Sequence, residues 1–195
     1  MKIKICGITN FEDAVLSIKY GADFLGFIFA ESPRKIEIKT CAEIIRTIKK
    51  DMILTVGVFM NQPIEYIEDV DIRCGFDLIQ LHGGENVKEY KEKLNKPVIK
   101  RVTEIEKLEC CMDADYLLFD KTKLNGEILE ILSLKDYDIK KPYFLAGGLN
   151  CENAETLLEG NNAFGADVSS GIEKFPGKKD EMKLRRFIDI IRHLK

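Results

Sequence analysis

Cys6 lies where an alternating apolar segment meets Gly7, and its surroundings suit a reactive thiol. Side chains alternate along a strand, so Lys4 and Cys6 fall on one face of the strand that we predict over Lys2–Cys6. A nearby ammonium favours the thiolate over the thiol, which is the form that acts as a base or nucleophile. The alternative is a cysteine that only packs, because free cysteines are among the most buried residues.

Asp120 and Arg34 also follow predicted strands and carry charges that catalysis could use. Asp120 ends the apolar run Tyr116–Phe119, where partial burial would raise its pKa and suit it to general acid catalysis. It could equally cap a helix. Arg34 stands in a loop after Pro33 and could pair bidentately with a substrate carboxylate, or simply be solvated. Both residues are candidates for a site at the ends of the strands.

Polar residues and glycines follow three later strands as well. Gln80 and His82 share one face where a strand ends, and we expect them to contact a ligand, although a structural histidine is the alternative. Glycines let backbone N–H groups approach an anion, so two loops on consecutive strands predict a phosphate site. The residues of these loops are Gly147, Gly148, Ser169, Ser170 and Gly171.

Short apolar runs alternate with amphipathic stretches along the whole chain. The predicted strands are Lys2–Cys6, Phe24–Phe29, Leu54–Phe59, Leu78–Leu81, Val98–Val102, Tyr116–Phe119, Tyr143–Ala146 and Ala166–Ser169. The predicted helices are Phe11–Tyr20, Thr40–Lys49, Ile64–Asp71, Val87–Leu94, Ile105–Met112, Glu127–Leu134, Cys151–Glu159 and Glu181–Leu194. Such alternation predicts an α/β fold with a parallel sheet. Eight strand–helix pairs favour a closed (β/α)8 TIM barrel in one domain over residues 1–195. An open doubly wound sheet is the alternative.

A closed barrel has two consequences for the candidate residues. Active sites of such barrels lie at the carboxyl ends of the strands, where all the polar residues above would meet. The last strand neighbours the first, so Asp167 could approach Lys4, which points inward one layer below Cys6. We hypothesise a buried ion pair between them that orients the base, and Asp167 joins the candidate substrate-binding residues.

Composition narrows the possible partners. The chain has 195 residues, of which 45% are hydrophobic and 32% charged, and a net charge of -3. This balance fits a globular protein and gives no electrostatic sign of nucleic-acid binding. We expect no membrane span and no signal peptide. Six cysteines without a Cys-x-x-Cys spacing, and two distant histidines, argue against a disulfide framework or a zinc site. We therefore expect a cytoplasmic protein without a metal.

From end to end, the chain resembles phosphoribosylanthranilate isomerase, a barrel of tryptophan biosynthesis. The resemblance rests on blocks in the family's order: Lys4–Thr9, Gly21–Phe29, Ser32–Arg34, Val56–Phe59, Gln80–Gly83, Leu145–Asn150, Ala166–Glu173 and Pro176–Asp180. It implies the Amadori rearrangement of N-(5-phosphoribosyl)anthranilate to 1-(2-carboxyphenylamino)-1-deoxyribulose 5-phosphate.

Carried onto this sequence, the resemblance assigns roles to individual residues. Asp120 would be the general acid that opens the ribose ring, and Cys6 the general base that removes the C2′ proton. Arg34 would hold the anthranilate carboxylate, and the loops at Gly147-Gly148 and Ser169–Gly171 the phosphate. It implies a small phosphoribosyl substrate, no metal or organic cofactor, and a monomer or homodimer.

The sequence departs from the family after the sixth predicted strand. Family members usually carry a glycine-rich stretch there, followed by a turn with an aromatic residue, an acid and tryptophan. This chain has Lys121–Leu129 instead, with one glycine, and has no tryptophan. The loop normally covers the substrate beside the general acid, and enclosure strengthens electrostatic interactions by excluding water. We therefore predict a less efficient enzyme, or one with relaxed substrate choice.

Two other functions stay open at this point. One is a different phosphosugar isomerase on the same barrel, such as the histidine-pathway Amadori isomerase, which uses an aspartate as base where this chain has Cys6. The other is a non-catalytic barrel that binds a phosphorylated ligand or a partner protein. The altered sixth loop supports it, whereas the presence of Cys6, Asp120 and Arg34 together opposes it.

Overall fold

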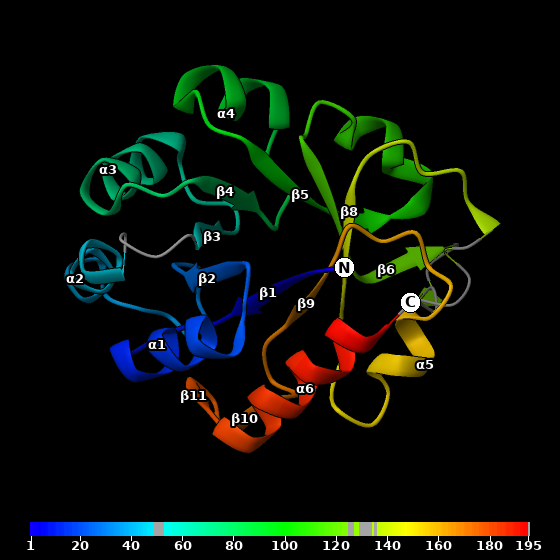
Figure 1. Cartoon of the computed structure of the whole chain (residues 1–195). Helices are drawn as coiled ribbons and strands as arrows, with labels where there is room; N and C mark the ends of the chain where they lie inside the picture. The colour runs from blue at the N-terminus through cyan, green and yellow to red at the C-terminus, as the bar shows by residue number, and fades with distance from the viewer. Residues whose placement is uncertain (49–52, 125–126, 129–133, 135, 195) are drawn as a thin grey trace.

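The computed structural model describes residues 1–48, 53–124, 127–128, 134 and 136–194. Eight parallel strands close into a barrel, because β5 pairs with β6 and β9 pairs with β1 (Figure 1). These strands are β1 (Lys2–Cys6), β2 (Phe24–Ile28), β3 (Leu54–Phe59), β4 (Leu78–Leu81), β5 (Val98–Glu104), β6 (Tyr116–Leu124), β8 (Tyr143–Ala146) and β9 (Gly165–Val168). The closure confirms the predicted TIM barrel and excludes the open sheet.

Helices surround the barrel and bury its outer face (Figure 1). They are α1 (Phe11–Tyr20), α2 (Ile38–Ile48), α3 (Ile64–Cys74), α4 (Val87–Leu94), α5 (Ala154–Leu158) and α6 (Glu181–His193). Asn10 caps α1, because its side-chain oxygen accepts a hydrogen bond from the Asp13 N–H at 3.0 Å. None of the helices in the described ranges is both long and apolar enough to cross a membrane.

The fifth and sixth connections differ from the prediction. Ile105–Cys111 is a 3-10 helix, η1, where an α-helix was expected. The helix predicted over Glu127–Leu134 is wrong at its start, because β7 (Glu127–Ile128) pairs antiparallel with the extended end of β6. Its remainder falls largely on residues outside the described ranges. Strand pairing beyond Asp120 has therefore overridden the local helical pattern in the segment where the sequence departs from the family.

A short hairpin after β9 brings a further set of charges to the barrel. Strands β10 (Glu173–Phe175) and β11 (Lys178–Lys179) pair antiparallel, with Glu173 opposite Lys179. The turn between them lies over the loop after β1, where the Thr9 hydroxyl donates to the Gly177 carbonyl oxygen at 2.5 Å. The chain then enters α6, whose first N–H groups are capped by Asp180.

The barrel interior changes from apolar to polar along the strands. Phe24 and Phe144 pack edge to face with ring centroids 5.4 Å apart, and with Phe164 they fill the interior near the start of the strands. Lys4 and Asp167 are paired in the register of β1 and β9 and lie further along. Cys6 is the last residue of β1. The aromatic layer therefore closes one end and leaves the carboxyl ends of the strands for chemistry.

Candidate active site

A cavity of about 370 Å³ opens at the carboxyl ends of the strands. Ten of the eleven candidate residues from the sequence line it, namely Cys6, Arg34, Gln80, His82, Asp120, Gly147, Gly148, Asp167, Ser169 and Ser170. Gly171 is not among the lining residues. It bridges to Asn150 instead, and a Cβ there would lie 1.9 Å from the Leu149 carbonyl oxygen. The structure thus gathers residues from six barrel strands or the loops that follow them.

Cys6 stands beside a fully buried ion pair. The Lys4 Nζ lies 2.9 Å from the Asp167 Oδ2, with no exposed surface on Lys4 and 7% on the Asp167 side chain. Gly26 on β2 makes room for this arrangement, because a Cβ there would lie 2.9 Å from the Cys6 Sγ and 3.1 Å from the Lys4 Nζ. The predicted ion pair is therefore confirmed, and a side chain at position 26 would have to displace Cys6 or Lys4.

Burial and charge oppose each other at the Cys6 thiol. Burial raises the pKa of Cys6 above its ordinary value, and Lys4 acts in the other direction, as the sequence predicted. The net direction is upward, so Lys4 offsets only part of the effect of burial on the pKa of Cys6. Burial lowers the pKa of Lys4, but Asp167 and Cys6 raise it by more, so its pKa lies above the ordinary value. Lys4 thus stays an ammonium and can stabilise a thiolate when one forms.

Asp120 faces a neutral histidine across the cavity. The His82 Nε2 lies 3.5 Å from the Asp120 Oδ2, and burial, followed by the charge of Arg101, lowers the pKa of His82 to about 4. The Gln80 Nε2 lies 3.3 Å from the other ring nitrogen, Nδ1. With the amide NH2 of Gln80 toward Nδ1, the ring proton sits on Nε2, toward Asp120. Gln80 thus contacts His82, and His82 in turn contacts the candidate acid, while both residues line the cavity.

Arg34 is held by a carboxylate that the sequence did not single out. Its Nε and Nη2 donate to the two oxygens of Glu173 at distances of 2.7 to 3.0 Å. Glu173 occupies the Nε–Nη2 edge, so the Nη1–Nη2 edge is the one that a second carboxylate would use. Ile28, Val58 and other apolar residues line the cavity near the β2 and β3 ends. An apolar ring that carries a carboxylate fits this part of the cavity.

The loops after β8 and β9 have the properties of an anion site. Gly147 and Gly148 both line the cavity and adopt a φ of 92°, a left-handed conformation that favours glycine. The Ser169 Oγ is buried and has no hydrogen-bond partner within the described residues. One oxygen of Asp167, Oδ1, is in the same situation. Buried polar atoms usually have partners, so these atoms indicate where a ligand would bind.

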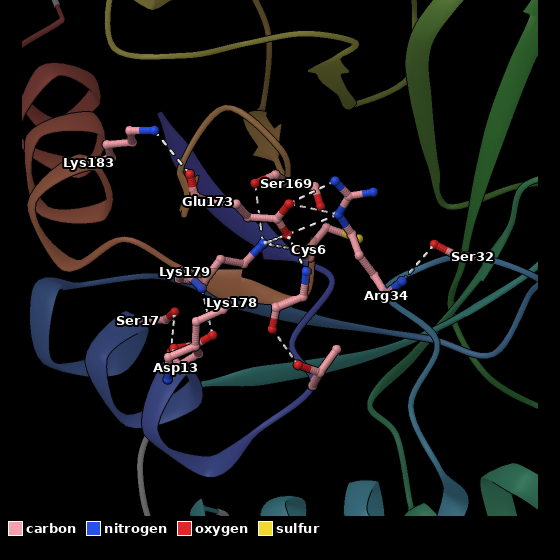
Figure 2. A network of polar contacts seen from close by, with 12 residues as sticks. Cys6, Asp13, Ser17, Ser32, Arg34, Ser169, Glu173, Lys178, Lys179 and Lys183 are labelled. Atoms are coloured by element: carbon pink, nitrogen blue, oxygen red, sulfur yellow. Dashed lines mark hydrogen bonds and ion pairs between the residues drawn. The ribbon is translucent and has the colours of Figure 1, made fainter. Parts of the chain in front are cut away.

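Sequence reasoning missed Lys179 and the role of Glu173. Lys179 has no exposed side-chain surface, and its Nζ lies 3.0 Å from the Glu173 Oε1. Figure 2 shows the two side chains directed toward each other. The Pro176-Gly177 turn could have identified the pair, because it predicts a hairpin in which flanking residues face one another. Within the described ranges, no group of histidine, cysteine and acidic residues has the geometry to hold a metal ion.

The chain is similar to known proteins along nearly all of its length. The family model for N-(5'-phosphoribosyl)anthranilate (PRA) isomerase matches residues 3–190. The isomerase of Bacillus mycoides is 42% identical over 199 residues, with 96% of each chain covered. A crystal structure of phosphoribosyl anthranilate isomerase in complex with reduced 1-(o-carboxyphenylamino)-1-deoxyribulose 5-phosphate is 34% identical, with full coverage of both chains and a TM-score of 0.87.

A second similar structure concerns assembly. Monomers generated from the dimeric isomerase of Thermotoga maritima match at 34% identity, a TM-score of 0.82 and full coverage of both chains. The family model covers nearly all of the sequence, and the relatives are similar along their whole lengths. The chain therefore belongs to the N-(5'-phosphoribosyl)anthranilate isomerase family.

Proposed function

We propose that this protein carries out the isomerase reaction of its family, the Amadori rearrangement of N-(5-phosphoribosyl)anthranilate in tryptophan biosynthesis, with Asp120 as general acid and Cys6 as general base. The observation that carries the proposal is one cavity lined by an acid, a thiol, an arginine and two anion-binding loops. Each part of this substrate, the carboxylate, the ring oxygen, the C2′ proton and the phosphate, has a matching group there.

Asp120 acts in the first step. Its proton passes to the ribose ring oxygen, the bond between C1′ and that oxygen breaks, and the substrate nitrogen supplies the electrons that form a cationic Schiff base. The His82 side chain faces the carboxyl group of Asp120. Because its imidazole is neutral, it places no competing positive charge beside the developing cation.

Cys6 acts in the second step. Its thiolate removes the C2′ proton, and the electrons of that C–H bond neutralise the Schiff base to give an enolamine, which tautomerises to the product ketone. Burial raises the pKa of Cys6, but a cationic Schiff base beside the sulfur favours the thiolate, because opposite charges close together stabilise each other. Lys4 adds to the same effect. The thiol releases its own proton to water before the sulfur takes up the C2′ proton. Each positioned acid or base contributes about 10²–10⁴ in rate.

The rest of the cavity binds the substrate. Arg34 holds the anthranilate carboxylate, while Gly147, Gly148, Ser169 and Ser170 hold the phosphate through backbone N–H groups and hydroxyls. The free oxygen of Asp167 accepts a hydrogen bond from a sugar hydroxyl. We further propose that residues 1–195 form a single domain in the cytoplasm that acts as a monomer or homodimer, uses no cofactor, and binds neither nucleic acid nor membranes.

The test follows the loss of substrate fluorescence in the parent and in the variants Cys6→Ser and Asp120→Asn. We expect each substitution to lower kcat by about 10²-fold or more. Cys110→Ser and Asp113→Asn are matched controls, because both parent residues are exposed, and they should keep parental rates. Parental turnover in Cys6→Ser or Asp120→Asn would remove that residue from the mechanism.

A further inference from the structure

One buried ammonium connects several segments around the cavity. The Lys179 Nζ donates to the Cys6 carbonyl oxygen at 2.6 Å and to the Ser169 carbonyl oxygen at 3.3 Å. Its third partner is the Glu173 Oε1, at 3.0 Å. Figure 2 shows that Glu173 lies between Lys179 and Arg34, so the contacts form a continuous path. Lys179 thus joins the end of β1 to the loop after β9, and Glu173 extends the path to Arg34 in the loop after β2.

The partners of Lys179 identify its charge state. Three acceptors surround its nitrogen, and an ammonium has three N–H donors, whereas a neutral amine has two. Burial lowers the pKa of Lys179 overall, and Glu173 opposes part of this effect. Its side chain has no exposed surface, and Glu173 has 4%. A charge this well buried is retained only where its partners compensate for the lost water.

The charges of the network determine what Arg34 presents to the cavity. Lys179 and Arg34 are both cations, and they share the single carboxylate of Glu173. With Lys179 present, the three groups together carry one net positive charge. Without Lys179, Glu173 would neutralise Arg34 alone, and no net charge would remain for an incoming carboxylate.

We propose that Lys179 is a positioning residue for recognition of the substrate carboxylate: it shares Glu173 with Arg34 and so leaves the Nη1–Nη2 edge of Arg34 oriented and electrostatically attractive. The same ammonium fixes the carbonyl groups of Cys6 and Ser169. The carboxylate site is therefore built on the same anchor as the base and one phosphate loop. This inference rests on the proposed function, because it concerns the carboxylate of that substrate.

The test compares two ligands by calorimetry. One is reduced 1-(o-carboxyphenylamino)-1-deoxyribulose 5-phosphate, and the other is the same compound without its carboxyl group. The dissociation constant of the compound without the carboxyl group, divided by that of the carboxylated compound, measures what the carboxylate contributes to binding. We expect Lys179→Met to reduce this ratio by roughly tenfold, the size of one weakened charged contact. A general loss of structure would weaken the binding of both ligands equally and leave the ratio unchanged.

Two further variants strengthen the test. Lys183→Met is the matched control, because the Lys183 Nζ donates to the backbone carbonyl oxygen of Glu173 at 3.0 Å and not to its carboxylate. This variant should leave the ratio unchanged. Lys179→Gln keeps a hydrogen-bond donor without the charge and should fold if Lys179→Met does not. It should also reduce the ratio.

The outcomes separate this inference from the proposed function. If the parent protein binds neither ligand, the proposed function itself fails. If the parent prefers the carboxylated ligand and the folded Lys179 variants keep that preference in full, the role of Lys179 is refuted alone. In an Arg34→Met background, Lys179→Met should reduce the ratio no further, because the carboxylate has already lost its partner.

Discussion

Removal of Lys4 should separate the structural and chemical roles of the ion pair inside the barrel. In Lys4→Met, the apolar side chain fills the same space, and Asp167 is left buried without its cation. Breaking a buried pair in this way costs about 3–5 kcal/mol. For a chain of this length each 1 kcal/mol lowers Tm by about 2–4 °C, so Tm should fall by roughly 6–20 °C. Circular dichroism is the appropriate probe, because the chain has no tryptophan.

Two comparisons isolate the cause of that loss. Lys2→Met removes a lysine from the same strand whose side chain is 51% exposed and pairs with Asp23, so it should cost about 0–1 kcal/mol. The double variant Lys4→Met/Asp167→Leu leaves no unpaired charge and should recover most of the lost stability.

The Cys6 thiol provides the second measurement. Lys4 lowers the pKa of Cys6 more strongly than Asp167 raises it, so loss of Lys4 raises the pKa and leaves less thiolate at pH 8. Alkylation of Cys6 by iodoacetamide, resolved by mass spectrometry from the exposed Cys110, should slow by about tenfold in Lys4→Met. It should stay slow in the double variant. If Lys4→Met matches Lys2→Met in stability and the parent in alkylation rate, the reasoning is refuted.

Three other predictions concern the cavity. The pKa of His82 is lowered to about 4, so between pH 6.5 and 4 the unfolded chain binds a proton that the folded chain does not. The free energy of unfolding should therefore decrease by up to about 3 kcal/mol as the pH is lowered through this range. Chemical denaturation should show a smaller decrease in His82→Gln, and an equal decrease would contradict the assignment. Gly26→Ala should lower kcat by about tenfold or more, because its methyl group displaces Cys6 or Lys4, and parental kinetics would show that the site yields easily. With its altered sixth loop, the parent should have a kcat/KM well below the upper end of the range of about 10⁴–10⁸ M⁻¹s⁻¹, and steady-state kinetics near that end would refute the loop argument.

Strand periodicity accounts for what the sequence predicted well. Alternation placed Lys4 and Cys6 on the inner face of the first strand, and barrel closure then required the last strand to lie beside it. These two facts suffice to predict the contact between Lys4 and Asp167. The same logic brought Asp120 and Arg34 to one end of the barrel, because parallel strands end at the same rim.

Contacts that depend on distances across the barrel could not be predicted in this way. The approach of His82 to Asp120 joins strands that are not neighbours, so it depends on the width and tilt of the barrel. The Glu173–Arg34 pair depends on how two segments outside the barrel strands fold. No periodic pattern in the sequence predicts the conformation of such segments. The helix expected over Glu127–Leu134 failed at its start because tertiary pairing outweighed local propensity.

The rate at which the parent protein consumes freshly prepared N-(5-phosphoribosyl)anthranilate tests the central claim most directly. Loss of the substrate's fluorescence is followed with and without protein, since the compound also decays spontaneously. The proposed chemistry predicts decay that is faster than this background and proportional to protein concentration. Decay at the background rate, in protein shown by circular dichroism to be folded, would contradict it.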